Sequence, residues 1–73
     1  MIAYYNISAF VTLCIIELIH DVEDHVVFYI SNNDTGEHSH KTKSRVRYTV
    51  KGAPYFMHKG HRIYLDECMR VKI

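Results

Sequence analysis

Histidine is the residue type in this sequence with the clearest potential for metal chemistry. Six of the 73 residues are histidine, and two pairs lie close together, at His38 and His40 and at His58 and His61. Such imidazoles, joined by a cysteine thiolate, could in principle complete a tetrahedral zinc site. However, the sequence has no Cys-x-x-Cys pair, and His38 and His40 fall in a polar stretch where solvated histidine is common. We therefore predict no cofactor and no native metal, with zinc at these four histidines as the alternative.

Two groups of carboxylates could serve acid–base chemistry if the fold placed them in a pocket. One group is Asp21, Glu23 and Asp24, and the other is the adjacent pair Asp66 and Glu67. Catalysis needs a nucleophile beside a base, or paired carboxylates in a cleft, and no sequence feature places either group in one. A domain this small also rarely encloses a substrate-sized pocket. We predict that the protein is not an enzyme and has no small-molecule substrate. The first group either docks a basic partner or keeps an exposed turn soluble.

Basic and aromatic residues gather in the carboxyl-terminal half. Residues 41–51 contain five Lys or Arg and no acid, and further tyrosines and arginines follow. Positive charge tracks phosphates and aromatic rings stack on bases, so one sheet face carrying both would suit single-stranded nucleic acid. Tyr and Arg also anchor protein interfaces, and a solvated sheet face could carry the same residues. The predicted partner-binding residues are Tyr4, Tyr5, Lys43, Arg45, Arg47, Lys51, Tyr55, Arg62 and Tyr64.

The net charge of +1 conceals two halves of opposite charge. Residues 1–37 contain six Asp or Glu and no Lys or Arg, whereas residues 38–73 contain all nine Lys and Arg and only two acids. Such an asymmetry indicates a charged binding surface. The alternative, compatible with the first, is that strands from the two halves pair and neutralise each other across a sheet.

The apolar run at 7–19 is the segment around which the interior must form. It contains one charge, Glu17, no Gly or Pro, and five β-branched residues, which favour a pleated surface. We predict a strand over 3–18 that is covered on both faces and pairs in an antiparallel hairpin with a second strand over 25–30. A helix over 7–19 with Ser8 as its N-cap is the alternative.

The next segments predict a long loop followed by a half-buried strand. Residues 31–44 are almost entirely polar, so we expect a loop that is disordered in the free protein and that adds contacts to a partner. Residues 45–51 alternate in polarity, which predicts that Val46, Tyr48 and Val50 face the core while the basic residues between them face outward.

The last segments predict a hairpin and a short helix. A two-residue turn at Lys59 and Gly60 would join 55–58 to 61–65 and pair His58 with His61. In that register Phe56, Ile63 and Leu65 enter the core, and Tyr55, Met57, Arg62 and Tyr64 face away from it. Residues 66–71 predict one or two helical turns, with acids at the N-terminal end and Arg70 towards the C-terminal end.

These elements predict a mainly β protein, namely a small antiparallel sheet of four to five strands in a single domain spanning 1–73. The short C-terminal helix would make the fold α+β. The first five residues lack the basic region of a signal peptide, and the run at 7–19 is shorter than the roughly 20 residues of a membrane span. We therefore expect a cytoplasmic protein without a membrane partner, in which Cys14 and Cys68 are reduced.

In its size, its single compact domain and its divided charge, the chain resembles the small phage-encoded regulators that bind bacterial RNA polymerase or other host machinery. The resemblance is one of general character, and no functional residue is carried over from it. It implies a non-catalytic protein-binding module that docks a larger macromolecular machine and regulates transcription. The alternative function is an RNA- or single-stranded-DNA-binding β module that uses a basic and aromatic sheet face.

Overall fold

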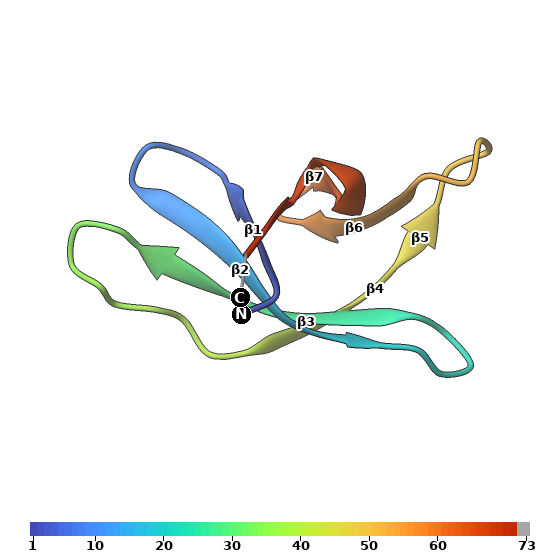
Figure 1. The fold of residues 1–73 in the computed structure, drawn as a ribbon, viewed down its shortest axis with the longest axis horizontal. Helices are drawn as coiled ribbons and strands as arrows, with labels where there is room; N and C mark the ends of the chain where they lie inside the picture. Colours follow the sequence, from blue (N-terminus) through green and yellow to red (C-terminus); the bar gives the residue numbers. More distant parts are fainter. Residues whose placement is uncertain (72–73) are drawn as a thin grey trace.

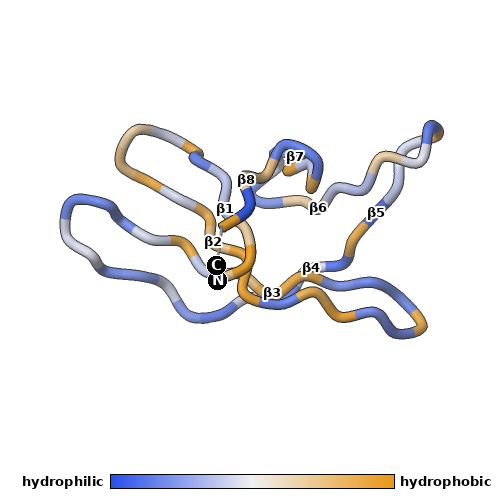
Figure 2. The backbone as a smooth tube through the Cα atoms, viewed as in Figure 1, coloured by the Kyte–Doolittle hydropathy of each residue, from blue (hydrophilic) through white to orange (hydrophobic). Residues whose placement is uncertain are grey.

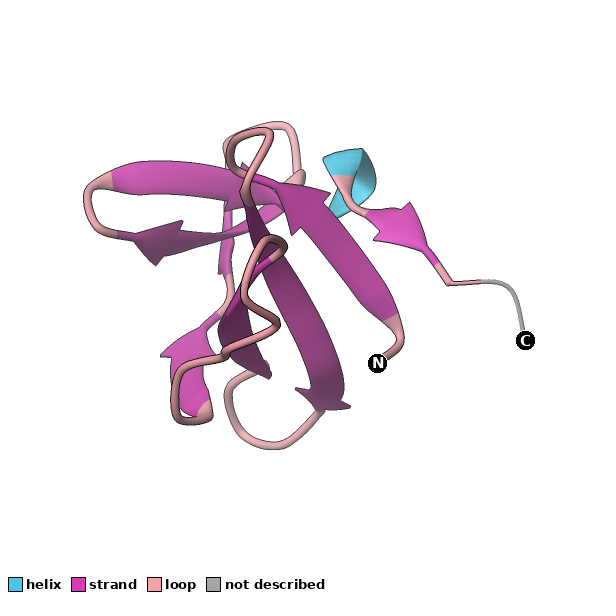
Figure 3. Cartoon of the chain, turned by 90° about the vertical axis from the view of Figure 1, so that its left-hand side faces the viewer, coloured by secondary structure: helices cyan, strands magenta, loops and turns pink. Residues whose placement is uncertain are grey.

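The computed structural model describes residues 1–71, which form two antiparallel sheets (Figures 1 and 3). The larger sheet has the order β4-β3-β2-β1-β8, and the smaller has the order β5-β6-β7. The mainly β fold class is therefore confirmed, although these residues form eight strands rather than four or five. No helix among them is long and apolar enough to cross a membrane. The strands are β1 (Ala3–Asn6), β2 (Val11–Ile19), β3 (His25–Asn32), β4 (Thr42–Arg45), β5 (Arg47–Tyr48), β6 (Pro54–His58), β7 (His61–Tyr64) and β8 (Met69–Arg70).

The predicted single strand over 3–18 is wrong, because the chain reverses at residues 7–10 and forms the β1–β2 hairpin. The turn is closed by backbone hydrogen bonds from Ile7 N–H to the Val11 carbonyl, 3.0 Å, and from Val11 N–H to the Ser8 carbonyl, 3.4 Å. The Ser8 hydroxyl also accepts a bond from the Phe10 backbone. Ile7 and Phe10 are exposed at this hairpin tip, which Figure 2 shows as an apolar loop.

The predicted pairing of the two apolar segments is confirmed, since β2 and β3 are antiparallel neighbours. Leu13, Cys14 and Ile15 are consecutive and all buried, as expected of a central strand covered on both faces. A bulge between Ile15 and Glu17 adds one residue to β2. Bulges increase local twist, which lets the long hairpin bend around the core.

The predicted loop over 31–44 is shorter in the structure, because β3 continues to Asn32 and β4 begins at Thr42. Asn32 organises the start of the loop: its side chain accepts bonds from the next residues, and its carbonyl accepts from Gly36 N–H at 2.9 Å. A bridge between Ser31 and His38 narrows the loop further.

The predicted strand over 45–51 is also wrong, because the chain changes sheets in the middle of it. Val46 lies between β4 and β5, is buried, and donates its backbone N–H to the Asp24 carbonyl at 2.8 Å. Beyond Val46 the expected alternation is lost. Tyr48 and Val50 are 56% and 109% exposed instead of facing the core.

The β6–β7 hairpin has the predicted register, which pairs His58 with His61 and Tyr55 with Tyr64. Lys59 and Gly60 form the turn with φ values of 48° and 80°. Positive φ at both central residues is the signature of the type I′ turn, whose twist matches that of a hairpin.

The predicted helix over 66–71 is reduced to a single 3-10 turn, η1 (Leu65–Glu67). Cys68 then has extended backbone angles, and β8 pairs with β1, Ala3 opposite Arg70 and Tyr4 opposite Met69. A helix this short would leave the hydrogen-bonding groups at the free edge of β1 unpaired. An extended segment can pair with them instead, as β8 does.

The core lies between the two sheets and joins them. It consists of buried residues from β2 and β3, from the crossover at Val46, and from the β6–β7 hairpin. The rings of Phe28 and Phe56, one from each sheet, pack with centroids 5.3 Å apart. Leu65 packs against the edge of this core, as predicted. The buried members are Leu13, Ile15, Val26, Phe28, Val46, Phe56 and Ile63.

Candidate binding surface

One face of the smaller sheet brings together most of the predicted arginines and tyrosines. Because paired residues share a face, the register places Arg47, Tyr55 and Tyr64 in one row across β5, β6 and β7. Met57 and Arg62 form the next row. The opposite face of the same hairpin buries Phe56 and Ile63 in the core. We call the outward surface formed by Arg47, Tyr55, Met57, Arg62 and Tyr64 the tyrosine–arginine face.

The side chains of this face contact one another. The Tyr55 and Tyr64 rings have centroids 5.5 Å apart, and the Arg62 guanidinium carbon lies 4.8 Å from the centre of the Tyr55 ring. The latter distance is within the range of a cation–π interaction. The Tyr64 hydroxyl, followed by Tyr55, raises the pKa of Arg62 above its usual value.

Lys51 extends this positively charged surface through the turn that follows β5. The turn is closed by bonds from Gly52 N–H to the Thr49 carbonyl, 2.8 Å, and from Thr49 N–H to the Ala53 carbonyl, 3.0 Å. Residues of this turn line a shallow depression together with Tyr55, Arg62 and Tyr64 of the tyrosine–arginine face, and no acidic side chain is among them. The lining residues are Tyr48, Thr49, Val50, Lys51, Ala53, Tyr55, Arg62 and Tyr64.

Arg45 does not belong to this face, contrary to the idea that 45–51 forms one strand beside 55–65. It ends β4 in the larger sheet, opposite His25. Its guanidinium lies 3.3 Å from the Glu23 carboxylate in the turn between β2 and β3. Here the two oppositely charged halves of the chain do neutralise each other.

Lys43 and Tyr4 lie on another surface, the outer face of the larger sheet. Lys43 and Glu17 flank Val27 on neighbouring strands. Tyr4 shares a row with Cys14, which is buried although it lies on this outer face. Tyr5 points the other way and packs against the core. The nine predicted residues therefore occupy several surfaces, and only Arg47, Lys51, Tyr55, Arg62 and Tyr64 come together.

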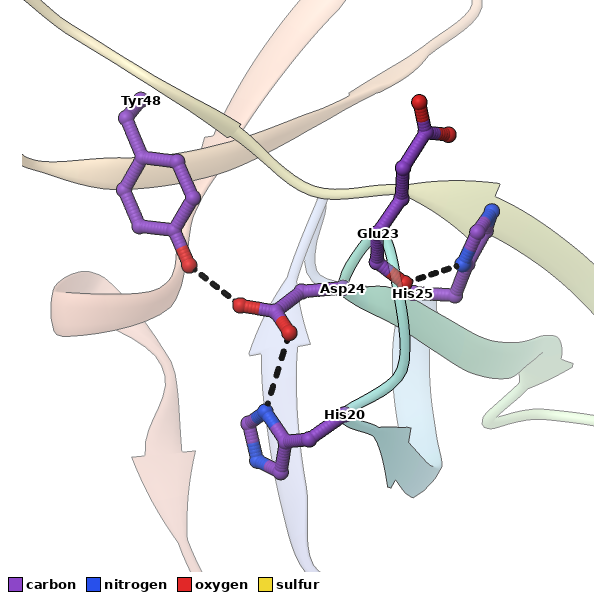
Figure 4. Close-up of polar contacts among 5 residues, drawn as sticks. All are labelled: His20, Glu23, Asp24, His25 and Tyr48. Carbon is purple, nitrogen blue, oxygen red and sulfur yellow. Dashed lines mark hydrogen bonds and ion pairs between the residues drawn. The ribbon is translucent and has the colours of Figure 1, made fainter.

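Asp24 links the turn between β2 and β3 to β5 through its side chain (Figure 4). The Tyr48 hydroxyl donates to one carboxylate oxygen at 2.5 Å, and His20 Nδ1 lies 3.2 Å from the other. These bonds, that of Tyr48 first, lower the pKa of Asp24, and the carboxylate in turn raises the pKa of Tyr48. An ionised Asp24 beside a protonated Tyr48 is a structural contact that is not poised for proton transfer near neutral pH.

The contact between Asp24 and Tyr48 was not predicted from the sequence. Asp24 and Tyr48 are 24 residues apart in the chain, and the alternating pattern at 45–51 pointed Tyr48 towards the core. The only available signal was the opposite charge of the two halves. That signal indicated attraction between them without identifying which side chains meet.

The histidine pairs have different surroundings. His58 is half-buried with its ring edge-on to Phe28, centroids 5.6 Å apart, and this burial, followed by the charges of Lys59 and His61, lowers its pKa. His38 packs against the Tyr29 ring at 5.1 Å, and His40 is exposed. Among residues 1–71, no three His, Cys, Asp or Glu side chains form a group that could hold a metal ion.

Comparisons with protein-family models, with curated proteins and with solved structures found no match to this chain.

Proposed function

We propose that the protein is a non-catalytic binding module that docks a larger protein assembly through the tyrosine–arginine face. The observation that carries this proposal is the arrangement of Arg62 over the Tyr55 ring, with Tyr64 packed beside it. Tyr and Arg are the residue types most often found at interface hot spots. Side chains already held in place by one another lose less conformational entropy when a partner binds.

The charges of this surface favour an acidic partner. Within residues 1–71, neither Arg47 nor Arg62 forms an ion pair with a carboxylate, and the depression beside them has no acidic lining. A guanidinium can bind a carboxylate through two parallel hydrogen bonds, so an Asp or Glu of the partner suits Arg62 well.

The class of partner follows from the resemblance to small phage-encoded regulators. We propose a bacterial host machine, with RNA polymerase the first to test and transcription the process regulated. The cytoplasm, where such machines work, is the proposed compartment. Free Cys14 and Cys68 support a reducing environment.

The test is capture from a bacterial lysate, followed by direct binding to the purified partner, with RNA polymerase as the first purified probe. Wild type should recover one defined large assembly, identified by mass spectrometry. Arg62→Ala should weaken direct binding by about 30-fold, the loss that corresponds to roughly 2 kcal/mol at a hot spot. Arg70→Ala is the matched control, since Arg70 is exposed on β8 in the other sheet. The proposal would be refuted if Arg62→Ala and Arg70→Ala weakened binding equally, or if the wild type recovered no defined assembly.

Binding of RNA or single-stranded DNA is the second candidate, favoured by Arg47, Lys51 and Arg62 beside two tyrosines. Base stacking needs a free ring face, and Arg62 already covers one face of Tyr55, which is why this function comes second. Fluorescence anisotropy with oligo(U) and oligo(dT) at low salt tests it. Binding that falls steeply with salt and is lost in Arg47→Glu plus Arg62→Glu would replace the first proposal.

A further inference from the structure

Two strand edges face a common groove between the sheets. β7 ends the smaller sheet, and β8 covers β1 only at Ala3 and Tyr4, so within residues 1–71 the rest of β1 has no paired strand on that side. Figure 1 shows β1 and β7 on the same side of the molecule. The groove between them is lined by Tyr5 and Ile7 from the β1–β2 hairpin and by His58, His61, Arg62 and Ile63 from the β6–β7 hairpin.

The backbone of β7 presents unused hydrogen-bonding groups to solvent. In a hairpin with a two-residue turn, the residues flanking the turn exchange both backbone bonds, and the pattern then alternates. His58 and His61 flank the turn, so the Arg62 and Tyr64 backbones point away from β6. In residues 1–71, no further backbone bond involves either residue, and only the Cys68 thiol approaches the Tyr64 carbonyl, at 3.5 Å.

The same reasoning identifies an unpaired position on β1. The bond from Ile7 N–H to the Val11 carbonyl sets the alternation of the β1–β2 ladder. Within that ladder the Asn6 backbone points away from β2, and β8 stops short of it. Asn6 on one edge and Arg62 on the other could therefore both bond to a strand lying between them.

We propose that this groove receives an extended, acidic segment of the partner protein, which adds to the edge of β7 as a further strand. The proposal rests on the proposed function and specifies how the partner is held. Strand addition takes its affinity from backbone bonds and its specificity from alternate side chains. The cationic and imidazole groups of the groove favour Glu or Asp, while Ile7, which is 42% exposed, favours an apolar residue next to them.

Charge argues against a second copy of this chain as the occupant. If two β7 edges paired in the register that sets Arg62 opposite Arg62, the two guanidinium groups would face each other across the strand pair. Like charges facing each other across a strand pair are destabilising. An acidic segment removes that repulsion, and β7 itself has no acidic residue.

The test uses the full chain made by chemical ligation with N-methyl-arginine at position 62, which removes the outward N–H and keeps the charged side chain. The matched control is N-methylation at Lys43, another exposed cationic residue, whose backbone points outward at the β4 edge of the larger sheet, since the bond from Val46 N–H to the Asp24 carbonyl sets the alternation of the β3–β4 ladder. The probes are a seven-residue peptide of alternating Glu and Val and its Lys-for-Glu counterpart. Circular dichroism verifies that both methylated proteins are folded.

We expect the acidic peptide to bind at least 10-fold more tightly than the basic one, and to slow hydrogen exchange of the Arg62 and Tyr64 amides. N-methylation at 62 should weaken binding at least 10-fold, and N-methylation at 43 should not. Equal binding of both peptides, or binding without protection of these amides, would overturn the proposal. A concentration-dependent dimer abolished by N-methylation at 62 would overturn it too, by assigning the groove to a second copy.

The purified partner separates this proposal from the function on which it rests. If Arg62→Ala loses the partner while the N-methyl-Arg62 protein keeps it, strand addition is wrong and the tyrosine–arginine face stands. If neither change affects binding, both proposals are wrong.

Discussion

The contact between Phe28 and Phe56 provides a direct test of whether the two sheets unfold as one unit. These buried rings come from different sheets and lie 5.3 Å apart, and Phe56 has no exposed surface. The tyrosine–arginine face is the reverse side of the strand that carries Phe56. Its geometry therefore depends on this contact.

The magnitude follows from core packing. Phe56→Ala should cost roughly 3–5 kcal/mol, whereas a chain of this length has a total stability of only about 4–11 kcal/mol. If the stability lies at the lower end of this range, the alanine variant would be largely unfolded. We therefore choose Phe28→Leu, Phe56→Leu and the double variant, and we expect a coupling free energy of about 0.5–1.5 kcal/mol, which is the contribution of an aromatic pair beyond its buried area.

The assay is urea unfolding followed by far-ultraviolet circular dichroism and by tyrosine fluorescence. We expect a single transition that coincides for the two signals in every variant. Val50→Ala is the control, since Val50 is fully exposed and its replacement should change stability by no more than about 0.5 kcal/mol. Additive effects of the two leucine substitutions, or separate transitions for the two signals, would refute a shared core.

Three further predictions concern pH, backbone strain and charge. Because the pKa of His58 is lowered in the folded state, its protonation favours the unfolded chain. The free energy of unfolding should therefore fall as pH drops below about 6.5 and level off below the pKa of His58 in the folded protein. In a His58→Gln variant, the urea midpoint should lose this part of its pH dependence. Gly60→Ala meets no neighbouring atom but must adopt φ +80°, so denaturant unfolding should show a loss of roughly 1–2 kcal/mol; an unchanged midpoint would contradict a type I′ turn. Arg45→Glu breaks the exposed pair with Glu23 and should lower stability by up to about 1 kcal/mol without weakening partner binding, and a binding loss would return Arg45 to the site.

The hairpin over β6 and β7 could be predicted from the sequence because its information is local. A Lys-Gly dipeptide between two alternating segments specifies both the turn type and the register. The register in turn determines which side chains share a face. The sequence therefore predicted that Tyr55, Arg62 and Tyr64 share one face, and the register in the structure confirms this.

The boundaries at the other end of the chain could not be predicted in the same way. The β1–β2 turn contains neither Gly nor Pro, and it places Ile7 and Phe10 at an exposed tip. An apolar run of this composition looks like one continuous strand. The turn becomes visible only when Ser8 is seen to accept hydrogen bonds from Val11 and Phe10.

The segment around Val46 was misjudged because its conformation depends on distant partners. Alternation predicts a strand within one sheet, but the chain leaves the larger sheet at Arg45 and enters the smaller at Arg47. The backbone bond from Val46 to Asp24 and the bond from the Tyr48 hydroxyl to the same residue hold this crossover. No pattern within 45–51 encodes either bond.

The same contacts change how the charge asymmetry should be interpreted. The acidic turn between β2 and β3 binds the crossover through Glu23 and Asp24, so it acts as an internal partner for the basic segment. Arg45 is neutralised there, and Lys43 shares its sheet face with Glu17. In the described residues, neither arginine of the tyrosine–arginine face forms an ion pair, and no acidic side chain lines the depression that Arg62 shares with the adjoining turn. A binding partner would therefore respond to these few side chains, and the net charge of the carboxyl-terminal half overstates the attraction.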